Sequence, residues 1–268
     1  MPMAAGHEKC GSGGCERMYF RGKYHLLRPF MRYAGVRDKN VHGVLMRLDR
    51  SDLIQRHIYY GIYEEQELTW ICKYVRPGMT ILDIGANVGF FAAILSRWVG
   101  NSGRVFAFEP SPYALGKLQE VVRDNGLANL EVFPFGLGER DAIVNLYLDP
   151  SFNNHTPTML SDSRQPFSQA RIKTLDTVIT ELKLSKIDFL KIDVEGYEGR
   201  ILRGGMQAMR SGMIQCIMCE FDDFQVHRIE NQGYDLEEIF ASHHYRQVYP
   251  PPRSRKAQRN CNRFFVLQ

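Results

Sequence analysis

The sequence lacks any long hydrophobic segment. None of its apolar runs reaches the roughly 18–20 residues that cross a lipid bilayer. The first residues also lack the apolar core of a secretory signal peptide. We therefore expect neither a membrane span nor secretion. With 268 residues, 44% of them hydrophobic, the chain is long enough to bury the core of one enzyme-sized domain.

The sequence also has little excess charge. Lys and Arg number 34 against 30 Asp and Glu, and the basic residues are scattered apart from a small group within residues 253–259. Proteins that follow the phosphates of nucleic acids usually carry a continuous basic face. We therefore expect no nucleic-acid partner.

The six cysteines form no disulfide or metal framework that can be read from their spacing. Cys216 and Cys219 make a C-x-x-C within the apolar run MIQCIMCEF, where residues three apart in a strand point to opposite faces. No second pair of ligands accompanies them. We expect buried free thiols there, no metal, and a cytoplasmic protein.

The most informative stretch that is present is ILDIGANVGFF, from Ile81 to Phe91. An apolar strand containing Asp83 leads into a tight turn from Gly85 to Gly89, and an apolar run typical of a helix follows. A strand, a glycine turn and a helix N-terminus together hold nucleoside cofactors at the edge of a sheet.

A second buried strand, Arg104–Phe108, is followed directly by Glu109. This acid lies 26 residues after Asp83, close to the roughly 20-residue offset at which an acid binds ribose hydroxyls in such folds. We expect Glu109 to accept hydrogen bonds from two ribose hydroxyls. The two motifs together predict a nucleoside cofactor.

The glycine turn indicates which cofactor this is. A dinucleotide site needs G-x-G-x-x-G so that bare backbone can approach the pyrophosphate, but here Asn87 stands at the second glycine. No G-K-S/T of a phosphate-binding loop follows either. The pattern D-x-G-x-N-x-G suits S-adenosylmethionine, which has a ribose and no phosphate.

Strands and helices alternate through most of the chain, which predicts a doubly wound, Rossmann-like α/β sheet. The sheet should be mostly parallel, with an antiparallel hairpin (residues 245–251 and 263–268) at its C-terminal edge. The expected strands are Thr80–Ile84, Arg104–Phe108, Leu130–Phe135, Asp188–Asp193 and Met213–Phe221. The expected helices are Glu64–Val75, Gly89–Val99, Pro112–Asn125 and Tyr197–Ser211.

The remaining segments divide the chain. We expect a disordered leader at residues 1–17 and an N-terminal hairpin or cap segment at 18–60. The alternating runs His42–Arg50 and Leu53–Tyr60 predict the two strands of that hairpin. The cofactor-binding domain should then occupy residues 61–268, with an insertion at about 136–172.

A second unusual segment follows the strand that contains Lys191. A buried parallel strand should be apolar, yet this one carries a lysine and is followed by Asp193, Glu195 and Glu198. Ligands of open α/β sheets bind at the carboxyl ends of the strands. We expect a functional role for Asp193, whereas Glu198 suits the dipole of the following helix.

Several motifs in this order resemble one family. DIGANVGFF, FEPSP, the TLD of residues 174–176 and DFLKIDVEGYEGRILRG are similar to the FkbM family of S-adenosylmethionine-dependent methyltransferases. The resemblance runs from about Tyr60 to Phe221. It implies a class I methyltransferase fold and methyl transfer to a hydroxyl of a sugar, a glycan unit or a polyketide-type metabolite.

Candidate site residues follow from position and chemistry. Catalytic candidates are Asp193 and Glu195, by location, and His155, because an unperturbed imidazole titrates near neutrality. A divalent metal on Asp193, Glu195 and Glu220 is chemically possible, but no compact ligand motif supports one. The expected cofactor-binding residues are Asp83, Gly85, Ala86, Asn87, Gly89, Glu109, Pro110, Phe135 and Asp193.

Weaker candidates lie around these residues. Glu64 or Glu65 could contact the methionine amino group. Aromatic side chains near the hairpin and the insertion could stack on the acceptor: Tyr59, Tyr60, Tyr63 and Phe152.

Three other functions remain open. A nucleic-acid methyltransferase usually carries an N/D-P-P-Y/F loop, but Asp193-Val-Glu195 stands in its place. An NAD-dependent oxidoreductase is disfavoured by Asn87. A non-catalytic protein with the same fold is disfavoured by the intact Asp83, Glu109 and Asp193.

Overall fold

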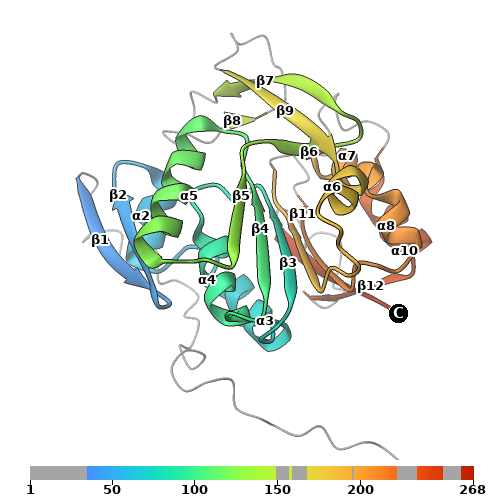
Figure 1. Ribbon diagram of the computed structural model, residues 1–268, viewed down its shortest axis with the longest axis horizontal. Helices are drawn as coiled ribbons and strands as arrows, with labels where there is room; N and C mark the ends of the chain where they lie inside the picture. Colours follow the sequence, from blue (N-terminus) through green and yellow to red (C-terminus); the bar gives the residue numbers. More distant parts are fainter. Residues whose placement is uncertain (1–34, 149–156, 159–167, 195, 222–233, 250–260) are drawn as a thin grey trace, which may run out of the picture.

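The computed structural model describes residues 35–148, 157–158, 168–194, 196–221, 234–249 and 261–268. A seven-stranded sheet lies at its centre (Figure 1). Its strands are β3 (Thr80–Ile84), β4 (Arg104–Phe108), β5 (Leu130–Phe133), β10 (Phe189–Ile192), β11 (Cys216–Phe221), β12 (Tyr245–Tyr249) and β13 (Cys261–Leu267). Their order is β12-β13-β11-β10-β3-β4-β5. Strand β13 runs in the direction opposite to that of the other six strands.

Helices cover both faces of this sheet. Alternate residues of each strand belong to two hydrophobic clusters, with Ile81 in one and Leu82 in the other. The first cluster includes residues of α2 (Leu53–Tyr60), α3 (Glu65–Tyr74), α4 (Phe90–Val99) and α5 (Pro112–Asn125). The second includes residues of α6 (Leu175–Glu181), α7 (Glu198–Gly204), α8 (Met206–Arg210) and α10 (Leu236–Ser242). This arrangement confirms the predicted doubly wound α/β fold with its antiparallel C-terminal edge.

The N-terminal hairpin differs from the prediction. It consists of β1 (Val36–Val41) and β2 (Val44–Asp49), joined by the two-residue turn His42-Gly43. Both turn residues have positive φ, 50° and 86°, as a two-residue hairpin turn requires. The predicted hairpin around Asp49–Asp52 is therefore wrong.

The run Leu53–Tyr60 forms α2 instead of a strand. The Asp52 side chain caps its first turn by accepting a hydrogen bond from the N–H of Gln55 at 2.8 Å. Gly61 ends it in the left-handed conformation, with φ 63°. These two caps outweigh the alternating pattern of the sequence, because each satisfies backbone groups that a helix end leaves without partners.

The expected helix Tyr197–Ser211 is interrupted at its double glycine. It forms the two short helices α7 and α8, which meet at Gly204-Gly205. A Cβ on Gly204 would lie 2.0 Å from the carbonyl oxygen of Gly138, and one on Gly205 would lie 2.6 Å from Leu175. The glycines therefore allow close packing that side chains would block.

Residues of the predicted insertion form a second, smaller sheet. It contains β6 (Gly136–Gly138), β7 (Ala142–Leu148), β8 (Pro157–Thr158) and β9 (Ser168–Thr174), in the order β6-β9-β7-β8. Figure 1 shows this sheet across the upper end of the large sheet. Most of these strands fall within the segment that the sequence analysis marks as an insertion, at about 136–172.

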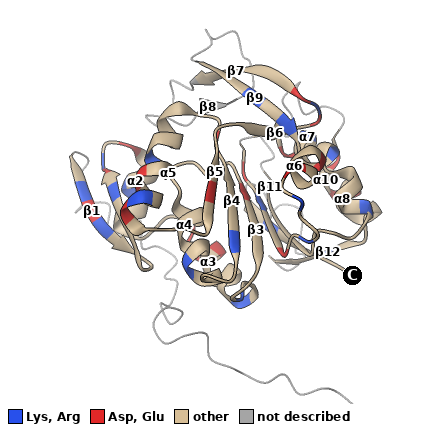
Figure 2. Cartoon of the chain, in the orientation of Figure 1, with Lys and Arg blue, Asp and Glu red and all other residues tan. Residues whose placement is uncertain are grey.

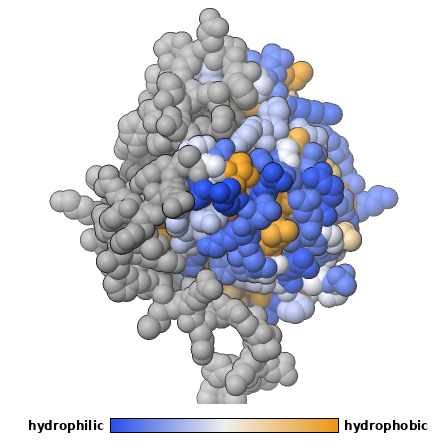
Figure 3. Space-filling view, turned by 90° about the vertical axis from the view of Figure 1, so that its left-hand side faces the viewer, coloured by the Kyte–Doolittle hydropathy of each residue, from blue (hydrophilic) through white to orange (hydrophobic). Residues whose placement is uncertain are grey.

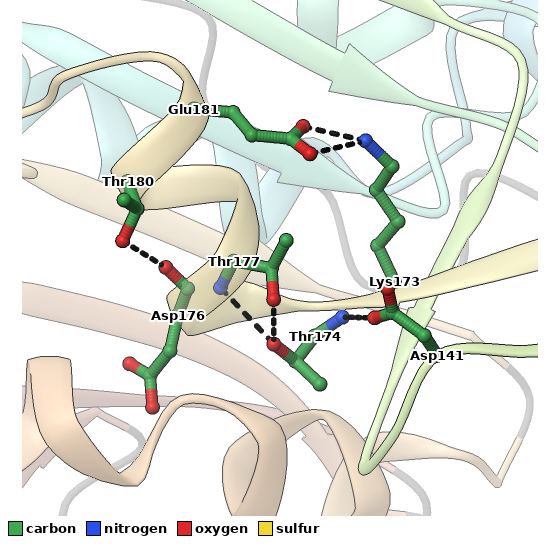
Figure 4. Close-up of polar contacts among 7 residues, drawn as sticks. All are labelled: Asp141, Lys173, Thr174, Asp176, Thr177, Thr180 and Glu181. Carbon is green, nitrogen blue, oxygen red and sulfur yellow. Dashed lines mark hydrogen bonds and ion pairs between the residues drawn. The ribbon is translucent and has the colours of Figure 1, made fainter.

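The Thr174-Leu175-Asp176 motif holds this region together (Figure 4). The Thr174 hydroxyl accepts the N–H of Thr177 at 3.0 Å and caps α6, and the Thr174 N–H donates to Asp141 at 3.1 Å. The Asp176 carboxylate accepts two backbone N–H groups at the start of α8, at 3.0 Å each. The motif therefore has a structural role.

On the one face drawn in Figure 3, the described surface is mostly hydrophilic. Figure 2 shows Lys and Arg dispersed among Asp and Glu over the described elements. On the face that carries the hairpin, hydrophobic residues form small separate patches (Figure 3). No described helix combines the length and apolarity needed to cross a membrane. Cys216 and Cys219 are buried free thiols, as predicted.

Candidate active site

A pocket opens where β3, β4 and β10 end. Three segments supply most of its polar lining: residues 85–88 of the glycine turn, 109–110 after β4, and 191–194 at the end of β10. Strands β6 and β7 of the small sheet close one side. The pocket encloses about 880 Å³ when the open solvent at its mouth is counted.

Gly85 has to be glycine because of the chain that lies beside it. Its φ is 78°, and a Cβ at this position would lie 1.9 Å from the carbonyl oxygen of Asp193. Its N–H donates to the carbonyl oxygen of Phe108 at 3.0 Å. The turn is therefore wedged between the ends of β4 and β10.

Gly89, which the sequence analysis places among the cofactor-binding residues, allows two helices to pack closely. It lies at the N-terminus of α4 with φ 87°, and a Cβ there would lie 2.6 Å from the Leu118 side chain on α5. It is not among the residues that line the pocket. Gly89 therefore serves helix packing.

Glu109 is held by backbone on both of its oxygens. Oε2 accepts the N–H of Asn87 and Oε1 accepts the N–H of Ser111, each at 2.8 Å. Burial raises the pKa of Glu109 to about 7, although both hydrogen bonds act in the opposite direction. A carboxylate offers about four acceptor positions, so about two remain for the hydroxyls of a ligand.

Lys191 lies on the other side of the pocket, between two carboxylates. Its Nζ is 3.1 Å from Oδ2 of Asp193 and 3.4 Å from Oδ1 of Asp83. Burial alone would lower the pKa of Lys191, but the charges of Asp193, Asp83 and Glu64 outweigh it and raise the pKa. Burial raises the pKa of Asp83, against the attraction of Lys191.

Two further acids lie on the α3 side. Burial, followed by the charge of Asp193, raises the pKa of Glu64 well above its usual value. Burial also raises the pKa of Glu67. The Asn262 amide donates to Glu64 at 3.4 Å. The end of β10 is therefore rich in carboxylates.

Glu198 shapes the loop that follows Asp193. One of its oxygens accepts the N–H groups of Val194 and Gly196, both at 3.2 Å. Burial raises the pKa of Glu198 to about 7. Its role is structural, as expected for the acid at the start of this helix.

The pocket brings together most of the predicted site residues. Asp83 lies beneath the lining, fully buried, and Phe135 packs on the rings of Phe108 and Phe133. Neither is among the residues that line the pocket. The candidates Glu195 and His155 are outside the described residues. Six predicted residues do line it: Gly85, Ala86, Asn87, Glu109, Pro110 and Asp193.

Other lining residues were not selected from the sequence. Ile54 of α2 and Leu146 of β7 belong to segments whose place at the site depends on tertiary packing. Lys191 was not among the predicted site residues, although a lysine inside a buried strand was the available signal. Of the four aromatic candidates, Tyr63 lines the pocket and packs edge-on against Phe90.

A family profile described as "Methyltransferase FkbM domain" matches residues 83–247, which is more than half of the chain. The chain belongs to the FkbM methyltransferase domain family. This membership confirms the resemblance read from the motifs, and with it the methyltransferase class and S-adenosylmethionine as the cofactor. A second profile, "Protein-L-isoaspartate(D-aspartate) O-methyltransferase", matches residues 21–139 and so overlaps the first over residues 83–139.

Individual relatives of this FkbM-domain chain are distant. Methyltransferase 1 of Beauveria bassiana is 29% identical, over 46% of this chain and 57% of its own length. Hexuronic acid methyltransferase AglP of Haloferax volcanii is 28% identical, over 48% and 51%. 2-O-methyltransferase NoeI of Sinorhizobium fredii is 24% identical, over 57% and 67%. The chain thus matches little more than half of the first two relatives.

Solved structures with a similar course of the chain include Aeropyrum pernix fibrillarin in complex with S-adenosyl-L-methionine. It is 17% identical, with 72% of this chain and 68% of that chain covered and a TM-score of 0.42. A methyltransferase from Aquifex aeolicus is 16% identical over 75% and 88%, with a TM-score of 0.43.

Proposed function

We propose that this chain transfers the methyl group of S-adenosylmethionine to a hydroxyl oxygen of a sugar, a glycan unit or a polyketide-type metabolite. One observation carries the proposal. The pocket places Glu109, with acceptor positions to spare, across from the carboxylate-rich end of β10, and the glycine turn lies between them.

The residues present fit the cofactor. Glu109 would accept hydrogen bonds from the two ribose hydroxyls, while the turn from Gly85 to Asn87 would lie along the rest of the molecule. Asp193, with its side chain 18% exposed, would take the methionine amino group or the acceptor. Phosphates would not fit this lining, because Glu109 and Asp193 would repel them.

When bound, S-adenosylmethionine supplies an activated methyl group for in-line displacement by the acceptor oxygen. The main task of the pocket is then alignment, which can contribute about 7–11 kcal/mol. An alcohol also needs a base, worth about 10²–10⁴-fold in rate. Lys191 cannot serve, because it remains protonated. Asp193 is the candidate in the pocket, and Glu195 and His155 stay predictions.

The acceptor class is inferred from three features. The names of two relatives specify a hexuronic acid and a 2-O position. Tyr63 lines the pocket beside Phe90, and an aromatic face of this kind can stack on a sugar. Among the described residues, Lys and Arg are dispersed among Asp and Glu (Figure 2), whereas a nucleic-acid site usually has a continuous basic face.

The proposal is tested by calorimetric titration with S-adenosylmethionine, S-adenosylhomocysteine and NAD. We expect micromolar binding of the two adenosyl compounds and none of NAD. Neutral sugars, hexuronic acids, polyketide-type alcohols and RNA are then offered as acceptors with radiolabelled cofactor. Label in RNA alone would refute the hydroxyl-metabolite acceptor, and absence of adenosyl binding would refute the whole proposal.

The division at residue 60 and the cytoplasmic location stay predictions from the sequence. In the structure, Val44 and Met46 of the hairpin belong to the same hydrophobic cluster as α4. A truncation at residue 60 would therefore expose apolar core.

A further inference from the structure

Three charged side chains follow one another at the floor of the pocket. Lys191 of β10 and Asp83 of β3 are register partners in neighbouring parallel strands. Asp193 is two residues beyond Lys191, so its side chain is on the same face of the sheet as that of Lys191. The ammonium group lies 3.4 Å from Asp83 and 3.1 Å from Asp193 and so joins the two strands.

The ammonium group has partners on several sides. Its Nζ lies within ion-pair distance of Asp193 and of Asp83, and the centroid of the Phe91 ring lies 5.2 Å from it. A ligand would have to displace one of these partners. Lys191 therefore acts on a ligand through its neighbours.

Asp83 fixes Lys191 from below. It is 0% exposed, and neither of its oxygens receives a hydrogen bond of normal geometry from the described residues. Lys191 is thus the charge that balances this buried carboxylate. Removing one partner of a buried ion pair costs far more than removing both, so Lys191 is held in place.

Asp193 needs this cation because other acids surround it. Its charge raises the pKa of Glu64 and Glu67 on the α3 side and of Glu198 on α7. These carboxylates in turn repel the charge of Asp193. The ammonium at 3.1 Å offsets that repulsion.

We propose that Lys191 is a positioning residue, which holds the Asp193 carboxylate at the pocket and ties it to Asp83 beneath the glycine turn. Although Lys191 lines the pocket, we assign it this indirect role because its ammonium group faces the two carboxylates. The inference rests on the proposed function, because Asp193 has its binding role only there.

A double-mutant cycle tests the proposal. S-adenosylhomocysteine affinity is measured by calorimetry for wild type, Lys191→Met, Asp193→Asn and the double variant. We expect each single change to weaken binding about tenfold, as for loss of one charged hydrogen bond. The double variant should also lose about tenfold, because Lys191 acts only through Asp193. A hundredfold loss in the double variant would overturn the inference.

The pH profile supplies a readout that a purely structural role would not change. Without Lys191, the acids at the end of β10 lose their nearest cation, so this group of acids as a whole should bind a proton at higher pH. Below neutral pH, the affinity of Lys191→Met for S-adenosylhomocysteine should therefore decrease more than that of wild type. This extra fall should vanish when Asp193→Asn is added. Its persistence in the double variant would contradict the inference.

Two controls keep the test decisive. If Lys191→Met does not fold, the cycle is run in an Asp83→Asn background, where no buried carboxylate is left without a cation. Lys117→Met removes a lysine that pairs with Glu120 on the surface of α5 and should leave the affinity unchanged. Failure of wild type to bind would refute the proposed function itself, whereas wild-type binding with additive losses would refute only the role of Lys191.

Discussion

The two sides of the pocket are built by different interactions. On the β4 side, Glu109 is fixed by two backbone N–H groups, those of Asn87 and Ser111. On the β10 side, Asp193 is fixed by a buried ammonium that it shares with Asp83. The first side has a carboxyl that titrates near neutrality, and the second has a cation that stays charged. Ligand binding should therefore depend on pH through the ionisation of Glu109, on the β4 side.

Gly85→Ala should have the largest effect, because this residue separates the two sides. The new Cβ would lie 1.9 Å from the carbonyl oxygen of Asp193, at φ 78°. We expect the free energy of unfolding to fall by about 3 kcal/mol or more and S-adenosylhomocysteine binding to be lost. Denaturant unfolding and calorimetry measure both.

The matched control is Gly116→Ala in the middle of α5. No atom lies within 4 Å of a Cβ built there, so the change should stabilise the helix by about 0.5–1 kcal/mol. Normal ligand affinity in Gly85→Ala would show that the contact with β10 does not form.

Glu109→Gln should have the second-largest effect on ligand binding. The amide retains one acceptor oxygen, turns an N–H₂ toward a backbone N–H, and removes the charge. Each charged hydrogen bond that is lost is worth about 1.5–3 kcal/mol, so we expect affinity for S-adenosylhomocysteine to fall by about 10–100-fold. Glu131→Gln, on an exposed acid that pairs with Arg104, should bind like wild type. Equal losses in both variants would deny Glu109 a specific role.

The pH dependence of ligand affinity distinguishes the β4 side of the pocket from the β10 side. The pKa of Glu109 is raised to about 7, and the ionised form accepts more hydrogen bonds. Affinity should therefore increase about tenfold between pH 6 and pH 8. Glu109→Gln should abolish this increase. An increase that survives in the variant would assign it to another group.

The same pKa has an effect on stability with a definite sign. A carboxyl whose pKa is raised by folding keeps its proton longer in the folded state than in the unfolded state. The free energy of unfolding of the ligand-free protein should therefore decrease as pH rises from about 4.5 to 7. Thermal unfolding across this range tests the direction, and Glu109→Gln should flatten it in part, because Glu198 shares the shift.

Asp176→Ala should have the smallest effect on the ligand. Its carboxylate caps α8, and neither it nor α8 lines the pocket, so the free energy of unfolding should fall by about 1–2 kcal/mol. Affinity for S-adenosylhomocysteine should not change. A matching loss of affinity would indicate that the TLD motif also serves the site.

The parallel strands could be predicted because their side chains are buried on both faces, which leaves a continuous apolar run bounded by turns. Glu109 could be predicted because its distance from Asp83 reflects one strand-helix-strand unit. The N-terminal hairpin could not, because LIQRHIYY alternates like a strand and its caps, Asp52 and Gly61, stand outside the run.

Other parts of the site depend on contacts between distant segments. Gly89 has the spacing of a cofactor-binding glycine, but it packs against Leu118, 29 residues further along the chain. Lys191 stood out in a buried strand, but one of its two partners, Asp83, lies in the neighbouring strand β3. Sequence spacing alone does not give such neighbours.

The most direct measurement is the affinity of wild type and Glu109→Gln for S-adenosylhomocysteine at pH 8, where Glu109 is ionised. If Glu109 anchors the cofactor, wild type binds with micromolar affinity and the variant binds about 10–100-fold more weakly. Equal affinities, or no binding by wild type, would contradict the assignment of this pocket to the cofactor.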